Sequence, residues 1–209
     1  PHGFEILAGA RQCPQWLPHE WIDWYKGLGE SIRGKVPAKS RLFLNINSEQ
    51  ACQPRIVHAI DQILLEKPCV IEWTEDVATC ATMERASQQI RRWRDRGAMI
   101  AVDDIGAGQD GIGRVLAVLP HYAKIDCTIL DRSRTTSPTF LRNLREILEG
   151  IGCKVIIEGI ETEDDLRYVR EAGFQLVQGY LYPATQHLAI AERAKENPAT
   201  LSLSPSFLP

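Results

Sequence analysis

The chain has 209 residues, of which 44% are hydrophobic and 24% are charged, and its formal net charge is −3. This composition is ordinary for a globular protein and excludes an intrinsically disordered one. The near-neutral charge excludes a protein that holds a DNA or RNA polymer by bulk positive charge, and no apolar run reaches the roughly 18 residues of a membrane span.

Apolar runs of strand length alternate along the chain with longer segments of helical period. The predicted strands are Gly3–Ala8, Arg41–Asn47, Cys69–Thr74, Met99–Asp103, Ala123–Asp126, Lys154–Glu158 and Leu176–Leu181. The predicted helices lie near His19–Arg33, Pro54–Glu66, Cys80–Arg96, Ile112–Val118, Thr139–Gly150, Glu163–Ala172 and His187–Lys195. Because the strands are continuously apolar and rich in β-branched residues, this alternation indicates parallel βα units that are buried on both faces.

Seven strand–helix units are one fewer than the eight that close a (β/α)8 barrel, and 209 residues is near the lower limit for that fold. A doubly wound open sheet is the alternative, but the glycine-rich phosphate-binding turn after its first strand is missing. We expect one barrel domain over residues 1–185. Residues 186–209 are expected to form a C-terminal helix and a flexible tail, and the tail Asn197–Pro209 could instead be an arm that covers an exposed edge.

The six cysteines are spread out and form no C-x-x-C pair. Several lie in apolar runs, where cysteine behaves as a small hydrophobic residue, so we expect reduced thiols in a cytoplasmic protein. The chain begins at Pro1 with neither Met nor a signal peptide, and we expect it to be a fragment.

A polar or charged residue stands at or near the C-terminal end of every predicted strand. In a parallel barrel these ends converge on one mouth, where the active site lies. A capping or salt-bridged acid explains any single position equally well. An unpaired carboxylate in an apolar strand costs several kcal/mol, however, so the whole set points to a shared cation. The residues are Glu5, Asn45, Glu72, Asp103, Asp104, Lys124, Asp126, Glu158 and Gln178.

Oxygen ligands without His or Cys in the same register select Mg²⁺, Mn²⁺ or Ca²⁺ and disfavour zinc and copper. The adjacent Asp103 and Asp104 fit two ions roughly 4 Å apart, which stabilise the attacking and leaving oxygens of an in-line displacement at phosphorus. Lys124 could hold a phosphate oxygen or orient the attacking water, and it could also form a salt bridge to a neighbouring acid. The residues alone therefore predict metal-dependent phosphoester chemistry.

Six motifs follow one another in the chain. They are F-L-N-I-N at Phe43–Asn47, I-E-W-T-E at Ile71–Glu75, V-D-D-I-G-A-G at Val102–Gly108, A-K-I-D at Ala123–Asp126, I-E-G-I-E-T at Ile157–Thr162 and Q-G-Y-L-Y-P at Gln178–Pro183. In order and spacing they closely resemble the EAL-domain family, whose members are bacterial (β/α)8-type phosphodiesterases that linearise the second messenger cyclic di-GMP.

The resemblance implies that two Mg²⁺ or Mn²⁺ ions bind, with Asp103 as the bridging group. It implies catalytic roles for Asp103, Lys124, Glu158 and Glu161, with Lys124 contacting the attacking water or phosphate and Glu161 supporting the site. Gln178 would line the substrate site, and Glu75 matches the residue that anchors the loop Ile105–Gly113. The implied metal ligands are Glu5, Asn45, Glu72, Asp103, Asp104 and Glu158.

The chain departs from the family pattern near its beginning. The signature reads E-I-L at Glu5–Leu7, and Gly9 stands where the family has a phosphate-binding arginine, so Arg11 is the predicted substitute. The family's first strand would lie upstream of Pro1, so we predict a TIM-like barrel that lacks its first strand or has it truncated. The unpaired edge left behind invites pairing with another chain, which predicts a homodimer.

The leading hypothesis is a cytoplasmic bacterial phosphodiesterase that hydrolyses cyclic di-GMP to linear pGpG. The alternative is a catalytically inactive EAL-like cyclic di-GMP receptor or protein-interaction module, which Gly9 and the altered loop favour. A third, weaker hypothesis is a different metal-dependent phosphodiesterase on the same barrel.

Overall fold

The structure is a computed structural model that describes residues 3–6, 17–32, 41–108, 110–137, 139–179, 181, 186–189 and 200–205. Its strands are β1 (Gly3–Ile6), β2 (Arg41–Ile46), β3 (Cys69–Trp73), β4 (Met99–Ile105), β5 (Tyr122–Ile125), β6 (Lys154–Ile157), β7 (Leu176–Val177), β8 (Gln186–Ala189) and β9 (Thr200–Pro205). Its helices are α1 (Pro18–Ile32), α2 (Ser48–Ala51), α3 (Pro54–Glu66), α4 (Cys80–Asp95), α5 (Gly111–Val118), α6 (Cys127–Thr136), α7 (Phe140–Gly150) and α8 (Glu163–Glu171).

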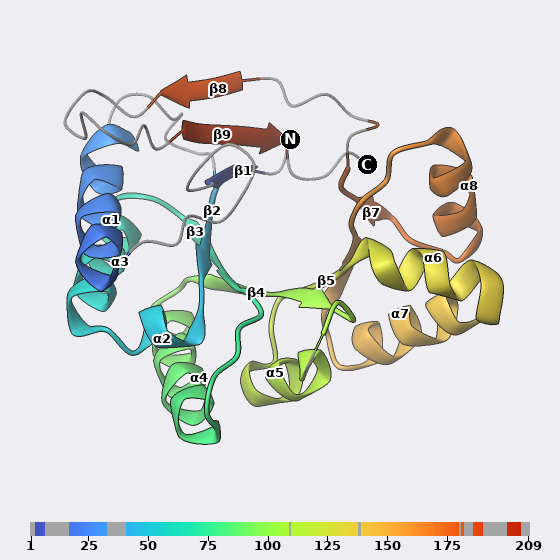
Figure 1. The fold of residues 1–209 in the computed structure, drawn as a ribbon, viewed down its shortest axis with the longest axis horizontal. Coiled ribbons are helices and arrows are strands. Elements are labelled where there is room, and N and C mark those ends of the chain that lie inside the picture. Colours follow the sequence, from blue (N-terminus) through green and yellow to red (C-terminus); the bar gives the residue numbers. More distant parts are fainter. Residues whose placement is uncertain are drawn as a thin grey trace.

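Strands β1 to β7 form a parallel sheet in the order of the chain, each paired with the next. Sequential parallel strands joined by helices are the winding of a (β/α)8 barrel, whereas a doubly wound sheet reverses its strand order. The helices lie around the outside of the sheet, with α1 and α3 at one end and α6 to α8 at the other (Figure 1). The predicted TIM-like barrel is therefore confirmed, and the described residues supply seven of its parallel strands.

The edge of β1 away from β2 pairs with an antiparallel strand near the end of the chain. Glu5 of β1 lies opposite Ser204 of β9, and β9 pairs on its other side with β8. The helix predicted over His187–Lys195 is wrong at residues 187–189, because these belong to β8. Backbone pairing in the hairpin and at the open edge of β1 outweighs a weak local preference for helix. Within the predicted tail, residues 200–205 form β9 along the edge of β1, where the alternative of an edge-covering arm would lie.

The core lies on both faces of the sheet. The larger apolar cluster packs the strands against the helices and includes the fully buried Trp73 and Trp93. A smaller cluster lines the opposite face and takes one residue from each of five consecutive strands. Its members are Phe43, Val70, Ala101, Tyr122 and Ile156.

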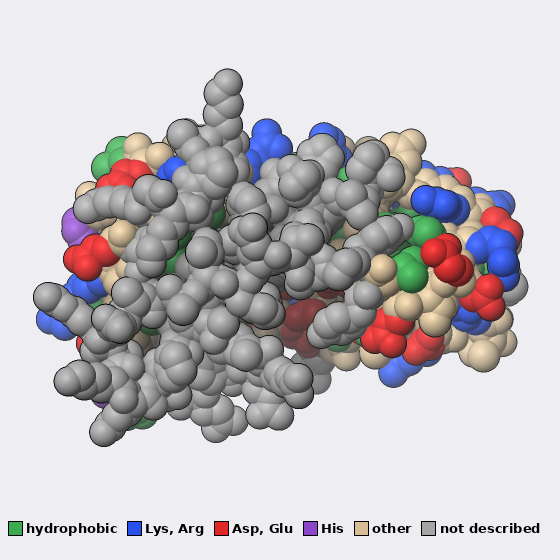
Figure 2. Space-filling view, turned by 90° about the horizontal axis from the view of Figure 1, so that it is seen from above, with side chains coloured by type: hydrophobic (Ala, Val, Ile, Leu, Met, Phe, Trp, Pro, Cys, Tyr) green, Lys and Arg blue, Asp and Glu red, His purple; other side chains and the backbone are tan. Residues whose placement is uncertain are grey.

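Outside the core, the surface over α6 to α8 mixes acidic and basic side chains (Figure 2). Two of the ion pairs there join Arg134 to Asp165 and Arg167 to Asp164, each at 2.5 Å. In the part of the chain that the structure describes, no helix is both long enough and apolar enough to span a bilayer.

Replacing Gly179 with Ala is expected to destabilise the fold. A Cβ atom at Gly179 would lie 2.2 Å from both the backbone N and O of Ile160, which cannot move independently of the chain. Such overpacking lowers the free energy of unfolding by about 2 kcal/mol, which denaturant titration would measure. Gly150→Ala is the matched control, because a Cβ there meets nothing within 4 Å. Equal stability of the two variants would contradict this prediction.

Candidate metal centre

The polar residues at the strand ends follow directly from the apolar layer inside the barrel. Successive side chains of a strand point to opposite faces, so residues two apart share a face. Five strands each place a polar residue two positions after a member of the inner cluster, toward the C-terminal end. These pairs are Phe43 and Asn45, Val70 and Glu72, Ala101 and Asp103, Tyr122 and Lys124, and Ile156 and Glu158. The barrel interior is therefore apolar below and polar at its mouth.

Lys124 lies at the centre of this polar layer. Its Nζ is 3.1 Å from Oε1 of Glu72, 2.9 Å from Oδ1 of Asp103 and 2.8 Å from Oε1 of Glu158. Lys124 and Glu72 are each 1% exposed, and Asp103 is 8% exposed. The predicted salt bridge of Lys124 is therefore confirmed. Its ammonium group contacts three acids, which lie in or directly after three other strands, instead of a single acid.

One ammonium group does not balance the negative charge of this layer. When the three carboxylates around Lys124 are ionised, two negative charges remain, and Asp104 lies beside them. Asp103, Asp104 and Glu158 each place a carboxylate oxygen within 4.8 Å of the others, close enough to share one cation. An oxygen-only donor set of this kind suits Mg²⁺ or Mn²⁺. The donors present therefore fit the metal that the sequence predicts.

An irregularity in β4 brings adjacent aspartates to the same site. In a regular strand Asp103 and Asp104 would point to opposite faces. Asp104 instead has a left-handed backbone, with φ 55°, and the pairing of β4 with β5 shifts register between Val102 and Ile105. Aspartate tolerates this conformation better than most residues, and such bulges re-aim side chains next to active sites. Burial, together with the neighbouring Asp103 carboxylate, raises the pKa of Asp104 to about 6.

The stability of the metal-free protein is expected to depend on the titration of Asp104. In the folded state the Asp104 carboxyl keeps its proton up to about pH 6, because the pKa of Asp104 is raised from 3.8. The unfolded chain releases the proton near pH 4, so stability is lost as the pH rises through this window. Between pH 5 and pH 7 the free energy of unfolding of the wild type should fall by about 1 kcal/mol relative to that of an Asp104→Asn variant, a value reduced for solvent screening. Denaturant titrations in EDTA at both pH values would measure this, and a pH-independent difference would contradict it.

The loop after the two aspartates packs closely against Glu75. A Cβ atom at Gly108 would lie 2.1 Å from Oε1 of Glu75, so the carboxylate rests close against the loop backbone at Gly108. Glu75 follows β3, and the loop connects β4 to α5. This contact places the predicted anchor residue beside the loop that it is expected to hold.

The remaining predicted site residues lie at or after strand ends, or are not described with their side chains. Asn45 is half-buried at the end of β2, where its backbone carbonyl accepts a 2.6 Å hydrogen bond from the Tyr25 hydroxyl. Gln178 follows β7 and donates its backbone N–H to Ile157 at 2.9 Å. Glu161 has an exposed side chain. Two predicted residues have no described side chain: Glu5 is described only through its backbone in β1, and Arg11 lies outside the described residues.

Sequence reasoning missed Arg114, which lies on α5 just behind the acids. Its side chain is 2% exposed and donates hydrogen bonds to backbone carbonyls of β3 and β4. The sequence gives one indication of this buried arginine, which is that Arg114 stands alone in the apolar run I-G-R-V-L-A-V-L at Ile112–Leu119. That signal does not reveal the arginine's partners, since these are backbone atoms.

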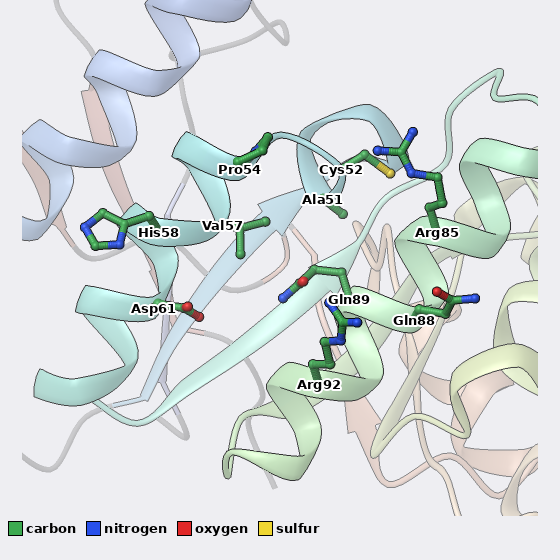
Figure 3. A pocket seen from close by; sticks show the side chains of 10 residues that line it. All are labelled: Ala51, Cys52, Pro54, Val57, His58, Asp61, Arg85, Gln88, Gln89 and Arg92. Atoms are coloured by element: carbon green, nitrogen blue, oxygen red, sulfur yellow. The ribbon is translucent and has the colours of Figure 1, made fainter.

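A cavity of about 400 Å³ lies elsewhere, between α3 and α4 (Figure 3). Its lining side chains come from α2, α3, α4 and the turn before α3, and none belongs to a strand. Arg85 and Arg92 of α4 and Asp61 of α3 are among them. This cavity is therefore separate from the acidic mouth of the barrel.

The family model described as "EAL domain" matches residues 29–184. Among solved structures, an EAL-domain protein from Bacillus subtilis, YkuI, in complex with cyclic di-GMP and calcium, superposes with a TM-score of 0.67 at 18% identity. The alignment covers 86% of this chain and 50% of that one. A manganese and cyclic di-GMP complex of BlrP1 from Klebsiella pneumoniae gives 0.62 at 22% identity, over 87% of this chain and 44% of that one. At these identities the superpositions establish the fold alone.

Among curated proteins, the cyclic di-GMP phosphodiesterase NbdA from Pseudomonas aeruginosa is 31% identical over 144 residues, covering 65% of this chain. The chain spans only 18% of NbdA, and no more than 25% of an uncharacterised Azorhizobium caulinodans protein that is 26% identical over 188 residues. The family model nevertheless covers well over half of the chain, and it includes every described residue of the acidic site from Asn45 to Gln178. The chain therefore belongs to the EAL domain family.

Proposed function

We propose that this domain is a divalent-metal-dependent phosphodiesterase that hydrolyses cyclic di-GMP to linear pGpG. The observation that carries the proposal is the meeting of Asp103, Asp104 and Glu158 within 4.8 Å at the mouth of the barrel, around a buried lysine. Relatives named as cyclic di-GMP phosphodiesterases support the choice of substrate. Five described cysteines are free, which suits the reducing cytoplasm that we propose for the protein.

The carboxylates of Asp103, Asp104 and Glu158 would hold Mg²⁺ or Mn²⁺. Glu72, Asn45 and Glu5 stand at the ends of neighbouring strands and would complete the ligand set. Once bound, the ions would supply positive charge to the attacking and leaving oxygens at phosphorus.

Lys124 supplies the fixed cation of the site. Three carboxylates hold its ammonium group, so the group is oriented before any substrate arrives. We propose that, when substrate binds, one of its three N–H groups turns from a carboxylate to a phosphoryl oxygen or to the attacking water, where it would stabilise the charge that develops in the transition state. Gln178 would line the substrate site from the end of β7, Glu161 would support it from the rim, and Glu75 would hold the loop Ile105–Gly113. Arg11 would contact a substrate phosphate.

The direct test is to incubate the protein with cyclic di-GMP and either Mn²⁺ or Mg²⁺, and to follow pGpG by chromatography. Metal-dependent formation of pGpG that EDTA abolishes is the expected result. Hydrolysis of bis(4-nitrophenyl) phosphate without turnover of cyclic di-GMP would instead indicate a different phosphodiesterase.

One observation favours the second candidate, a cyclic di-GMP receptor without activity. Lys124 already compensates part of the acidic charge, which lowers the demand for a metal ion. Calorimetric binding of cyclic di-GMP with no pGpG formed at saturating Mn²⁺ would decide for this alternative.

A further inference from the structure

Arg114 connects the ends of the two strands that carry Glu72 and Asp103. Its Nη1 donates to the carbonyl of Trp73 at 2.6 Å, and its Nη2 donates to the carbonyl of Asp103 at 2.9 Å. The guanidinium also lies 5.9 Å from the centroid of the Trp73 ring. A single buried side chain of α5 therefore joins β3 to β4 at the edge of the acidic site.

Arg114 acts where the regular pairing of the two strands ends, which in β4 is directly before Asp103. The last paired residues of β3 and β4 are Trp73 and Val102, and beyond Val102 the pairing with β5 shifts register. Buried carbonyls need donors, and a planar guanidinium can serve two carbonyls at once with fixed geometry. Arg114 supplies those donors where the strand ladder stops.

The charge of Arg114 is retained in this buried position. Burial lowers the pKa of Arg114, whereas the carboxylates of Glu75, Asp103, Asp104 and Asp76 raise it. An arginine stays protonated under these conditions, so its bonds to the carbonyls are charge-assisted.

We propose that Arg114 is a positioning residue for the metal centre, which fixes the backbone at Asp103 so that Asp103 and Asp104 present their oxygens to one cation. This inference rests on the proposed function, because it assumes that the acids bind a divalent ion. Arg114 itself touches neither metal nor substrate in this scheme.

The test compares Arg114→Met with Arg94→Met. Arg94 also donates to backbone carbonyls of the α5 region, those of Val118 at 2.7 Å and Leu119 at 3.3 Å, but at the end of α5 away from the acids. Both variants thus remove an arginine that holds the same segment. Calorimetric titration of the metal-free proteins with Mn²⁺ and melting in EDTA supply readouts that do not depend on activity.

We expect Arg114→Met to bind Mn²⁺ at least about tenfold more weakly than the wild type, the effect of losing an outer support of a metal site. Arg94→Met should bind Mn²⁺ within about twofold of the wild type even though its melting temperature falls, because its contacts lie away from the acids. Arg114→Lys should recover only part of the affinity, since an ammonium is a point donor without the planar fork.

Wild-type Mn²⁺ affinity in a folded Arg114→Met protein, or an equal loss in Arg94→Met, would overturn the inference. If Arg114→Met does not fold, Arg114→Lys decides, and full affinity in that variant would likewise overturn it. If the wild type binds no Mn²⁺, the proposed function fails and this inference fails with it. If the wild type binds Mn²⁺ and the Arg114 variants bind it equally well, only the positioning role of Arg114 is refuted, and the proposed function stands.

Discussion

Replacing Asp103 with Asn is expected to lower kcat for cyclic di-GMP hydrolysis by at least about 1000-fold. The Asp103 carboxylate contacts Lys124 at 2.9 Å, as Glu158 does at 2.8 Å, and both acids belong to the trio of carboxylates close enough to share a cation. An amide of the same shape keeps the packing but removes the negative charge on which cation binding depends. Steady-state assays at saturating Mn²⁺ would measure the loss.

The fold itself should tolerate this change. Lys124 keeps Glu72 and Glu158 as partners, and the acidic layer carries one negative charge fewer. The melting temperature in EDTA should therefore stay the same or rise. Asp131→Asn, an isosteric change at an exposed position of α6, is the matched control and should leave kcat unchanged. Retention of activity by Asp103→Asn would contradict the proposed chemistry.

Replacing Lys124 with Met is expected to cause the largest loss of stability in the site. The substitution leaves Glu72, Asp103 and Glu158 facing one another in a buried layer without their shared cation. Removing one partner of a buried ion pair costs about 3–5 kcal/mol, which corresponds to roughly 10 °C in the melting temperature of a domain of this size. Thermal melting in EDTA would measure it.

Added Mn²⁺ should raise the melting temperature of Lys124→Met by several degrees more than that of the wild type, because a divalent ion replaces the missing positive charge. Lys154→Met removes an exposed lysine from the other end of a neighbouring strand and should change the melting temperature little. If the two lysine variants had equal stability in EDTA, the central role of Lys124 in the acidic layer would be refuted.

The sequence predicts the acidic site well because two simple periodicities combine. Apolar strands alternate with helices, which places all C-terminal strand ends at one mouth, and a period of two then assigns each polar residue to the inner face. Glu72 two residues after Val70, and Lys124 two residues after Tyr122, follow this rule. Helix α3 is also predicted with its observed bounds, since Pro54 opens an amphipathic run.

Features that depend on distant backbone contacts could not be predicted in this way. Helix α6 was missed because Cys127–Thr136 is rich in threonine, a weak helix former, and its start depends on the Asp126 side chain accepting from the backbone of Thr128. Arg114 was missed because its partners, Trp73 and Asp103, are backbone carbonyls 41 and 11 positions away. Hydrogen bonds to distant backbone carbonyls cannot be predicted from the residues that surround Arg114 in the sequence.

The antiparallel strand β9 connects the first strand of the barrel to residues 200–205. Strand β1, which carries Glu5, has β2 on one side and β9 on the other, so Glu5 is flanked by Phe43 and by Ser204. The backbone of Glu5 is thus held on one side by Ser204, which lies far from it in the sequence. The second edge of β1 can therefore be paired only after residues 200–205 have been synthesised, well after β2 has paired with the first edge.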